Sequence, residues 1–152
     1  MKLVCNNLFE FLLESKQVGI LYHIMDYSSL LFNLTNDQIG GGSNHKLSFS
    51  RSKYYSEIPN HLPKNKVLSR FVLNGDKLSN RYKIKSVKDL DIKTDEYEEQ
   101  IIGIVKHLHT YLIKLQIYKE VLNAIDSYEE LNKIKDVIVE YSNKYNVNIE
   151  YI

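Results

Sequence analysis

The sequence predicts an α+β fold built as a single domain over residues 1–152. Apolar and polar residues alternate in "KLSFSR" and "RYKIKSV", which is typical of strands with one buried face. Near the C-terminus, apolar side chains recur instead at helical spacing. No linker rich in proline, glycine or serine divides the 152 residues, so we expect one core of ordinary size.

The first forty residues are expected to form a helix, a strand and a second helix. Residues 6–16 place several large apolar side chains on one side of a helix. Residues 20–25 are apolar enough for a core strand. Either Asp26 or Ser28 can cap the next helix, which is expected to run through Asn33.

The middle of the chain is expected to add strands and one long loop. Both prolines lie within residues 51–66, which predicts a surface loop of the length that often forms a lid. Asn74-Gly75 favours a turn between two strands, in a hairpin-like pair with a short helical turn. The strands expected here are residues 47–50, 70–73, 81–87 and 110–118.

The last segment is expected to form a long helix and a short edge strand. Ser127 and Glu130 have the spacing of a capping box, and Leu131, Ile134 and Ile138 continue as one apolar stripe. The closing "VNIEYI" has the composition of a strand.

The composition excludes several classes of protein. Twenty Lys and Arg residues against 19 Asp and Glu leave a formal charge of +1, unlike a strongly basic non-specific nucleic-acid binder. Cys5 is the single cysteine, which excludes an intramolecular disulfide and a cysteine-rich zinc site. No apolar run reaches membrane-spanning length, and no signal-peptide pattern is present. We therefore expect a cytoplasmic protein with no membrane partner.

Two short motifs suggest sites but are incomplete. His107 and His109 would share one face of a strand, but no HExxH or acidic cluster accompanies them, so exposed histidines without a metal are expected. "GGGS" at residues 40–43 lacks the Lys-Ser/Thr of a phosphate loop and is interpreted as a hinge.

His23 and the acidic run "TDEYEEQI" each allow two interpretations. An imidazole in a core strand needs partners for its nitrogens, so His23 is either a satisfied structural residue or part of a site. The acidic run is either a solvated surface or the start of a strand. In the second case Glu96 and Glu98 would share a face, suitable for stabilising an oxocarbenium-like transition state.

Three segments together resemble the signature of the ADP-ribosyltransferase-like fold, particularly small proteins of phage and prophage. They are "LYHIMDYSSL", "LSFSRSKYY" and "FVLNGDKLSNRYKIKSV" with the following "DEYEEQI", and they span roughly residues 18–118. The resemblance implies split mixed or antiparallel sheets with flanking helices. It also implies NAD as cofactor and transfer of ADP-ribose to a macromolecular target, either a host protein or a nucleic acid.

The resemblance also implies roles for individual residues. Glu98 would hold the hydroxyl of the nicotinamide ribose as the catalytic acid, with Glu96 as the upstream acid of an E-x-E pair. His23 would hydrogen-bond the adenosine ribose, and Ser48 or Ser50 would line the nicotinamide pocket.

The remaining cofactor contacts are expected just after the second segment. Arg51 would contact the pyrophosphate, and Tyr54 or Tyr55 would stack on nicotinamide.

Two alternatives to a protein-modifying enzyme stay open. The first is a non-catalytic phage-type interaction protein that inhibits a host defence or transcription complex, because many Tyr and Lys side chains suit a contact surface. The second is a transferase that targets nucleic acid. The basic residues that suggest it are Lys64, Lys66, Arg70, Lys83, Lys85 and Lys88.

Overall fold

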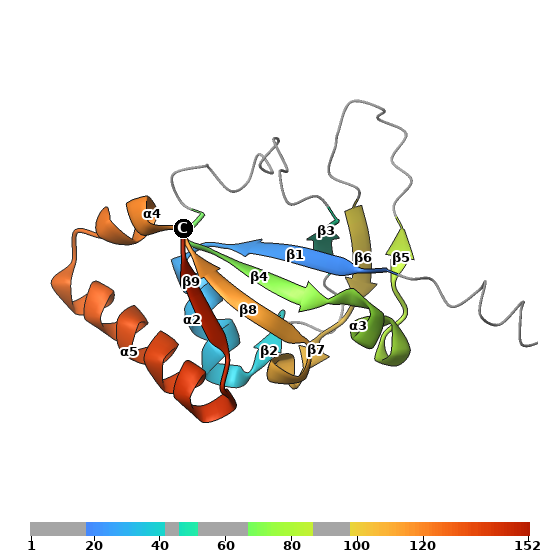
Figure 1. Ribbon diagram of the computed structural model, residues 1–152. Coiled ribbons are helices and arrows are strands. Elements are labelled where there is room, and N and C mark those ends of the chain that lie inside the picture. Colours follow the sequence, from blue (N-terminus) through green and yellow to red (C-terminus); the bar gives the residue numbers. More distant parts are fainter. Residues whose placement is uncertain (1–17, 42–45, 52–66, 87–97) are drawn as a thin grey trace, which may run out of the picture.

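The computed structural model describes residues 18–41, 46–51, 67–86 and 98–152 (Figure 1). The helix expected at residues 6–16 lies outside these ranges. So do the loop expected after Arg51, up to residue 66, and residues 42 and 43 of the glycine-rich motif.

The described residues form a mostly antiparallel sheet of seven strands in the order β5-β6-β3-β1-β4-β8-β9. The strands are β1 (Ile20–Met25), β3 (Lys46–Ser50), β4 (Ser69–Asn74), β5 (Lys85–Ser86), β6 (Glu98–Ile102), β8 (Leu112–Ile117) and β9 (Asn148–Tyr151). Only the β8–β9 pair among them is parallel. A second sheet pairs β2 (Gln38–Ile39) with β7 (Val105–Lys106). The predicted α+β class is confirmed.

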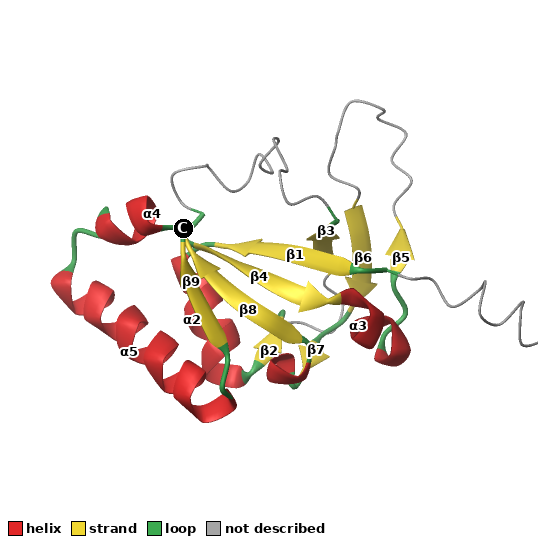
Figure 2. Ribbon diagram, viewed as in Figure 1, coloured by secondary structure: helices red, strands yellow, loops and turns green. Residues whose placement is uncertain are grey.

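Four α-helices accompany the sheets in the described ranges. They are α2 (Tyr27–Asn36), α3 (Gly75–Arg81), α4 (Lys119–Asn123) and α5 (Tyr128–Tyr145), and a short 3-10 helix, η2, spans Leu108–Thr110. Figure 2 shows α5 beside α2, near β8 and β9. The parallel pairing of β8 and β9 is possible because α4 and α5 carry the chain back between them.

The core lies between the large sheet and helices α2 and α5. Leu21 and Met25 of β1 are buried on the face covered by the helices, as are Phe71 and Leu73 of β4. The residues that make this contact include Leu21, Met25, Phe71, Leu115, Leu30, Leu34, Ile134 and Ile138. β4 is buried on its other face as well, where Arg70 and Val72 lie.

Two of the expected helix starts are confirmed by their caps. The Asp26 carboxylate accepts a hydrogen bond from the Ser29 N–H, so Asp26 rather than Ser28 caps α2. The Ser127 hydroxyl accepts one from the Glu130 N–H at the start of α5. Each cap satisfies a backbone donor that has no partner inside its helix.

The short helical turn expected after Asn74 is helix α3, but the hairpin expected around it is wrong, because β4 pairs with β1 and β8 whereas β5 pairs with β6. The Asn74 side chain accepts a hydrogen bond from the Lys77 N–H and caps α3. A Cβ added at Gly75 would stand 2.4 Å from the Gly19 carbonyl oxygen, so glycine permits the close approach of α3 to the start of β1. The strand expected over residues 81–87 is correspondingly reduced to Lys85–Ser86.

Asp37 joins three elements at the C-terminal end of α2. Its backbone is left-handed, with φ of 50°, and its carboxylate accepts hydrogen bonds from the His109 backbone N–H at 3.0 Å and the Tyr141 hydroxyl at 2.5 Å. The other carboxylate oxygen lies 2.5 Å from His109 Nδ1. Burial and the Asp37 carboxylate raise the pKa of Tyr141, so its hydroxyl keeps its proton. One carboxylate therefore ties α2 to η2 and α5.

Tyr141→Phe should lower the free energy of unfolding by about 1.5–3 kcal/mol, because it removes a hydrogen bond to a charged group and leaves that Asp37 oxygen one donor short. Chemical denaturation measures the change. Tyr128→Phe is the matched control, since Tyr128 is 78% exposed. Equal stabilities of the two variants would show that the Asp37 contact contributes nothing.

Candidate functional site

Parts of the three segments singled out in the sequence lie on three neighbouring strands, and other described parts of the third segment lie in β4, α3 and β5. β1 carries His23, β3 carries Ser48 and Ser50, and β6 begins at Glu98. Ser50 pairs with Tyr22 on one side and with Glu98 on the other. Residues distant in sequence are thus brought to adjacent positions at the centre of the sheet.

His23 is held by its own strand neighbours. Its Nδ1 lies 2.9 Å from the Ser48 carbonyl oxygen, and its ring packs between Phe49 and Phe71, with centroids 5.3 and 6.4 Å away. A carbonyl oxygen only accepts, so Nδ1 carries the proton and Nε2 is the accepting nitrogen. Burial lowers the pKa of His23, which favours this neutral form at pH 7.

The strand register divides the predicted site residues between two faces. His23 pairs with Phe71, whose side chain is fully buried on the core face. Ser48 and Ser50 alternate with the buried Phe49, so their hydroxyls lie on the opposite face. The histidine and the serine side chains therefore do not converge directly, and the contact between their strands runs through the Ser48 carbonyl.

A buried acid that the sequence interpretation missed lies on the core face. Glu99 pairs with Phe49 across the strands and is 2% exposed. Its carboxylate contacts Arg51 Nη2 at 2.6 Å and accepts hydrogen bonds from the Ser86 hydroxyl at 2.9 and 3.0 Å. A buried carboxylate needs such partners. The Glu98-Glu99 doublet was the available signal, because two adjacent acids in a strand point to opposite faces.

Arg51 therefore forms an ion pair with Glu99 within the protein itself. Its side chain is 37% exposed, and a guanidinium has five N–H donors, of which Glu99 contacts those on Nη2. Of the other predicted site residues, Glu98 is described in its backbone. Glu96, Tyr54 and Tyr55 lie outside the described residues.

The face opposite the core carries a polar row across β4, β8 and β9. Arg70 Nε donates to Gln116 at 2.8 Å, and the Gln116 amide donates to Glu150 at 3.3 Å. The Arg70 guanidinium also lies 5.0 Å from the ring centre of Tyr22 and 6.0 Å from that of Tyr118. Arg70 is 9% exposed, so its expected place in a basic surface is wrong.

His107 and His109 were expected on one face of a strand, but neither lies in a strand. His107 has a left-handed backbone with φ of 57° and is exposed, whereas His109 follows in η2 and bonds Asp37. The His109 ring stacks on Tyr145 at 4.2 Å between centroids. In the ranges that the structure describes, no group of three metal-ligating side chains stands together.

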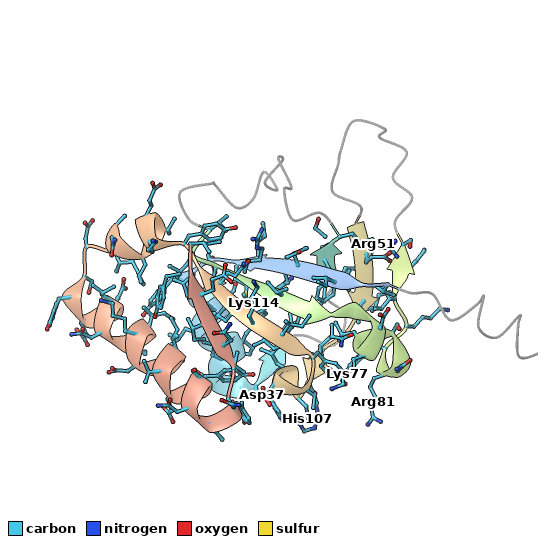
Figure 3. The ribbon with its side chains drawn as sticks, viewed as in Figure 1. Asp37, Arg51, Lys77, Arg81, His107 and Lys114 are labelled. Atoms are coloured by element: carbon cyan, nitrogen blue, oxygen red, sulfur yellow. The ribbon has the colours of Figure 1, made fainter. Side chains whose placement is uncertain are left out.

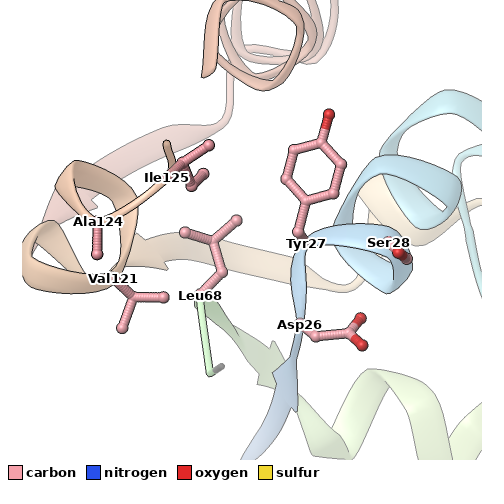
Figure 4. Close-up of a pocket in the computed structure, with 7 residues that line it drawn as sticks. All are labelled: Asp26, Tyr27, Ser28, Leu68, Val121, Ala124 and Ile125. Atoms are coloured by element: carbon pink, nitrogen blue, oxygen red, sulfur yellow. The ribbon is translucent and has the colours of Figure 1, made fainter. Parts of the chain in front are cut away.

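A shallow pocket of about 330 Å³ lies between the start of α2 and α4 (Figure 4). Its walls are Asp26, Tyr27, Ser28, Leu68, Val121, Ala124 and Ile125. None of the predicted site residues lines it, and the Asp26 carboxylate already caps α2. The acidic cap makes this helix start a poor place for a phosphate.

The comparisons with known proteins add no functional information on the site. No protein-family model and no curated protein matches the chain. None of the helices in the described part of the chain is long and apolar enough to cross a bilayer.

His23 should make stability depend on pH between about 5 and 7.5. Its pKa is lowered in the folded state from 6.5, so the unfolded chain binds more protons as pH falls through this range, and stability is fully present only above about pH 6.5. His23→Phe, which keeps an aromatic ring between Phe49 and Phe71, should reduce that dependence. Denaturation at several pH values measures it.

His107→Asn is the matched control, because His107 is exposed and asparagine tolerates a left-handed backbone. If His23→Phe and the parent protein lose the same stability between pH 7.5 and 5, the buried neutral imidazole is not the cause of the pH dependence.

Proposed function

We propose that the chain is an NAD-dependent protein of the ADP-ribosyltransferase-like class that transfers ADP-ribose to a macromolecular target. One observation carries this proposal: parts of the three segments that resemble the class lie on the neighbouring strands β1, β3 and β6, although they are far apart in sequence. Such adjacency is required if the three segments act on one dinucleotide, and within it Ser48 and Ser50 lie on the face of the sheet opposite His23.

The state of His23 suits a ribose hydroxyl. With Nδ1 donating to the Ser48 carbonyl, the neutral ring offers Nε2 as an acceptor. A sugar hydroxyl is a donor of the right kind. A protonated histidine would have no acceptor to offer, so the lowered pKa supports this role.

Arg51 suits a phosphate contact in spite of its ion pair. Glu99 is buried and contacts Nη2 of the guanidinium, while 37% of the Arg51 side chain remains exposed. A guanidinium held in this way loses little further freedom when it binds a pyrophosphate oxygen. Glu99 would then be a positioning residue for Arg51.

Glu98 would supply the electrostatic part of the chemistry. In the proposed transfer, the bond between nicotinamide and the ribose carbon breaks and nicotinamide leaves with the electron pair. The nucleophilic atom of the acceptor forms the new bond to that carbon and loses its proton to solvent. Positive charge develops on the ribose meanwhile, and a carboxylate bonded to a ribose hydroxyl stabilises it.

Glu98→Gln should reduce turnover about a hundredfold to a thousandfold while changing NAD affinity much less, because a preorganised charge acts mainly in the transition state. The measurement is nicotinamide release, together with label transfer from NAD to a cell lysate. Glu129→Gln is the matched control, since Glu129 is exposed at the start of α5. Transfer that persists in Glu98→Gln would contradict the catalytic role.

A non-catalytic interaction protein is the second candidate, and the engagement of Arg51 favours it. Arg51 already pairs with Glu99, and the hydroxyls of Ser48 and Ser50 lie on the other face from His23. A scaffold with these contacts needs no ligand to satisfy its buried charge. Co-purification of a stoichiometric partner with no covalent mass shift would support this candidate over the enzyme.

A further inference from the structure

Charge is unevenly distributed over the described surface, although the net charge is only +1. Exposed acids outnumber exposed bases around α4 and the start of α5, where Glu120, Asp126, Glu129 and Glu130 lie together with Lys119 and Lys133. Figure 1 shows α3, β5 and β7 at the other end of the structure. Five basic residues are exposed there. Four of them, Lys77, Arg81, Lys83 and Lys106, are named here the α3 patch, and the fifth is Lys85 of β5.

Contacts between neighbouring elements hold the α3 patch together. The Lys77 ammonium donates to the Thr110 carbonyl at 3.4 Å, and the Tyr82 hydroxyl accepts from the Lys106 backbone N–H at 2.9 Å. The Tyr82 and Tyr111 rings meet edge to face, 6.0 Å apart. In Figure 3 the side chains of Lys77, Arg81 and the exposed His107 point away from the sheet at this end.

The nearby acids do not neutralise the α3 patch. Asp76 accepts hydrogen bonds from the backbone N–H groups of Val18 and Gly19, at 2.7 and 3.1 Å. Asp37 is bonded to His109 and Tyr141. Within the described ranges, none of the four patch cations makes an ion pair, so their charges face solvent unpaired.

We infer that the α3 patch binds the phosphate backbone of a nucleic acid. The four cations are spread over α3, the turn after it and β7, so they suit a chain of evenly spaced phosphates better than one small anion. The backbone elements beneath them are packed and ordered by the Tyr82 contacts, which keeps the charges in a fixed arrangement. The acidic end of the molecule would orient the patch towards a polyanion.

This inference rests on the proposed function and specifies nucleic acid as the macromolecular target. Binding of nucleic acid to the α3 patch does not itself require NAD. Binding is measured without NAD, so its failure would leave the transferase proposal untouched. Conversely, an inactive transferase could still bind through the α3 patch.

Fluorescence anisotropy with a labelled 20-nucleotide single-stranded DNA tests the inference, with RNA of the same sequence and duplex DNA as further probes. Four phosphate contacts predict a slope of about −3 for log affinity against log salt concentration with the single strand. The double variant Lys77→Gln, Arg81→Gln should reduce that slope by about half. The control is Lys119→Gln, Lys135→Gln, which removes two exposed cations outside the patch.

Three results would overturn the inference. The first is no binding of any of the three probes at low salt, and the second is equal affinity in the patch variant and the control variant. The third is equally tight binding to polyglutamate or to phosphatidylserine vesicles, which would show a general response to negative charge. Unfolding midpoints of both double variants, compared with the parent protein, show whether a loss of binding comes from a loss of folding.

Discussion

The pairing register of β1 between β3 and β4 is the constraint on which the rest of the structure depends. It puts Leu21 and Met25 on the covered face and His23 opposite Phe71. A shift of one residue would expose both apolar side chains and move the imidazole to the other face. The same register puts Ser50 beside Tyr22, and so decides which residues of the candidate site share a surface.

Much of the fold was predictable because its signals are local. Alternation in "KLSFSR" and the apolar spacing of α5 identified real elements, and the capping residues Asp26 and Ser127 act as expected. The errors occur where a distant contact decides between two local possibilities. The strands before and after α3 do not form the expected hairpin, because β4 pairs with β1 and β8 instead, and no short window contains that information.

The candidate site was predictable in its strands but not in its side-chain partners. That His23 needs a partner follows from burying an imidazole, whereas the identity of that partner, the Ser48 carbonyl, depends on pairing across 25 residues. Glu99 was missed in favour of Glu98 because two adjacent acids in a strand do not show which of them faces the core. In the structure Glu99 faces the core and pairs with Arg51. Equally, Asp37 and His109 are separated by 72 residues, and their contact exists only in the folded chain.

A neutral His23 links the structural and the functional account, because the same contact that satisfies Nδ1 leaves Nε2 as an acceptor for a hydroxyl. The most direct measurement is isothermal titration calorimetry of NAD into the protein and into His23→Phe. The account predicts saturable binding with one site, weakened about tenfold in the variant, as expected for one lost hydrogen bond of about 1.4 kcal/mol. No saturable binding to the folded parent protein, or equal affinity in the two, would contradict it.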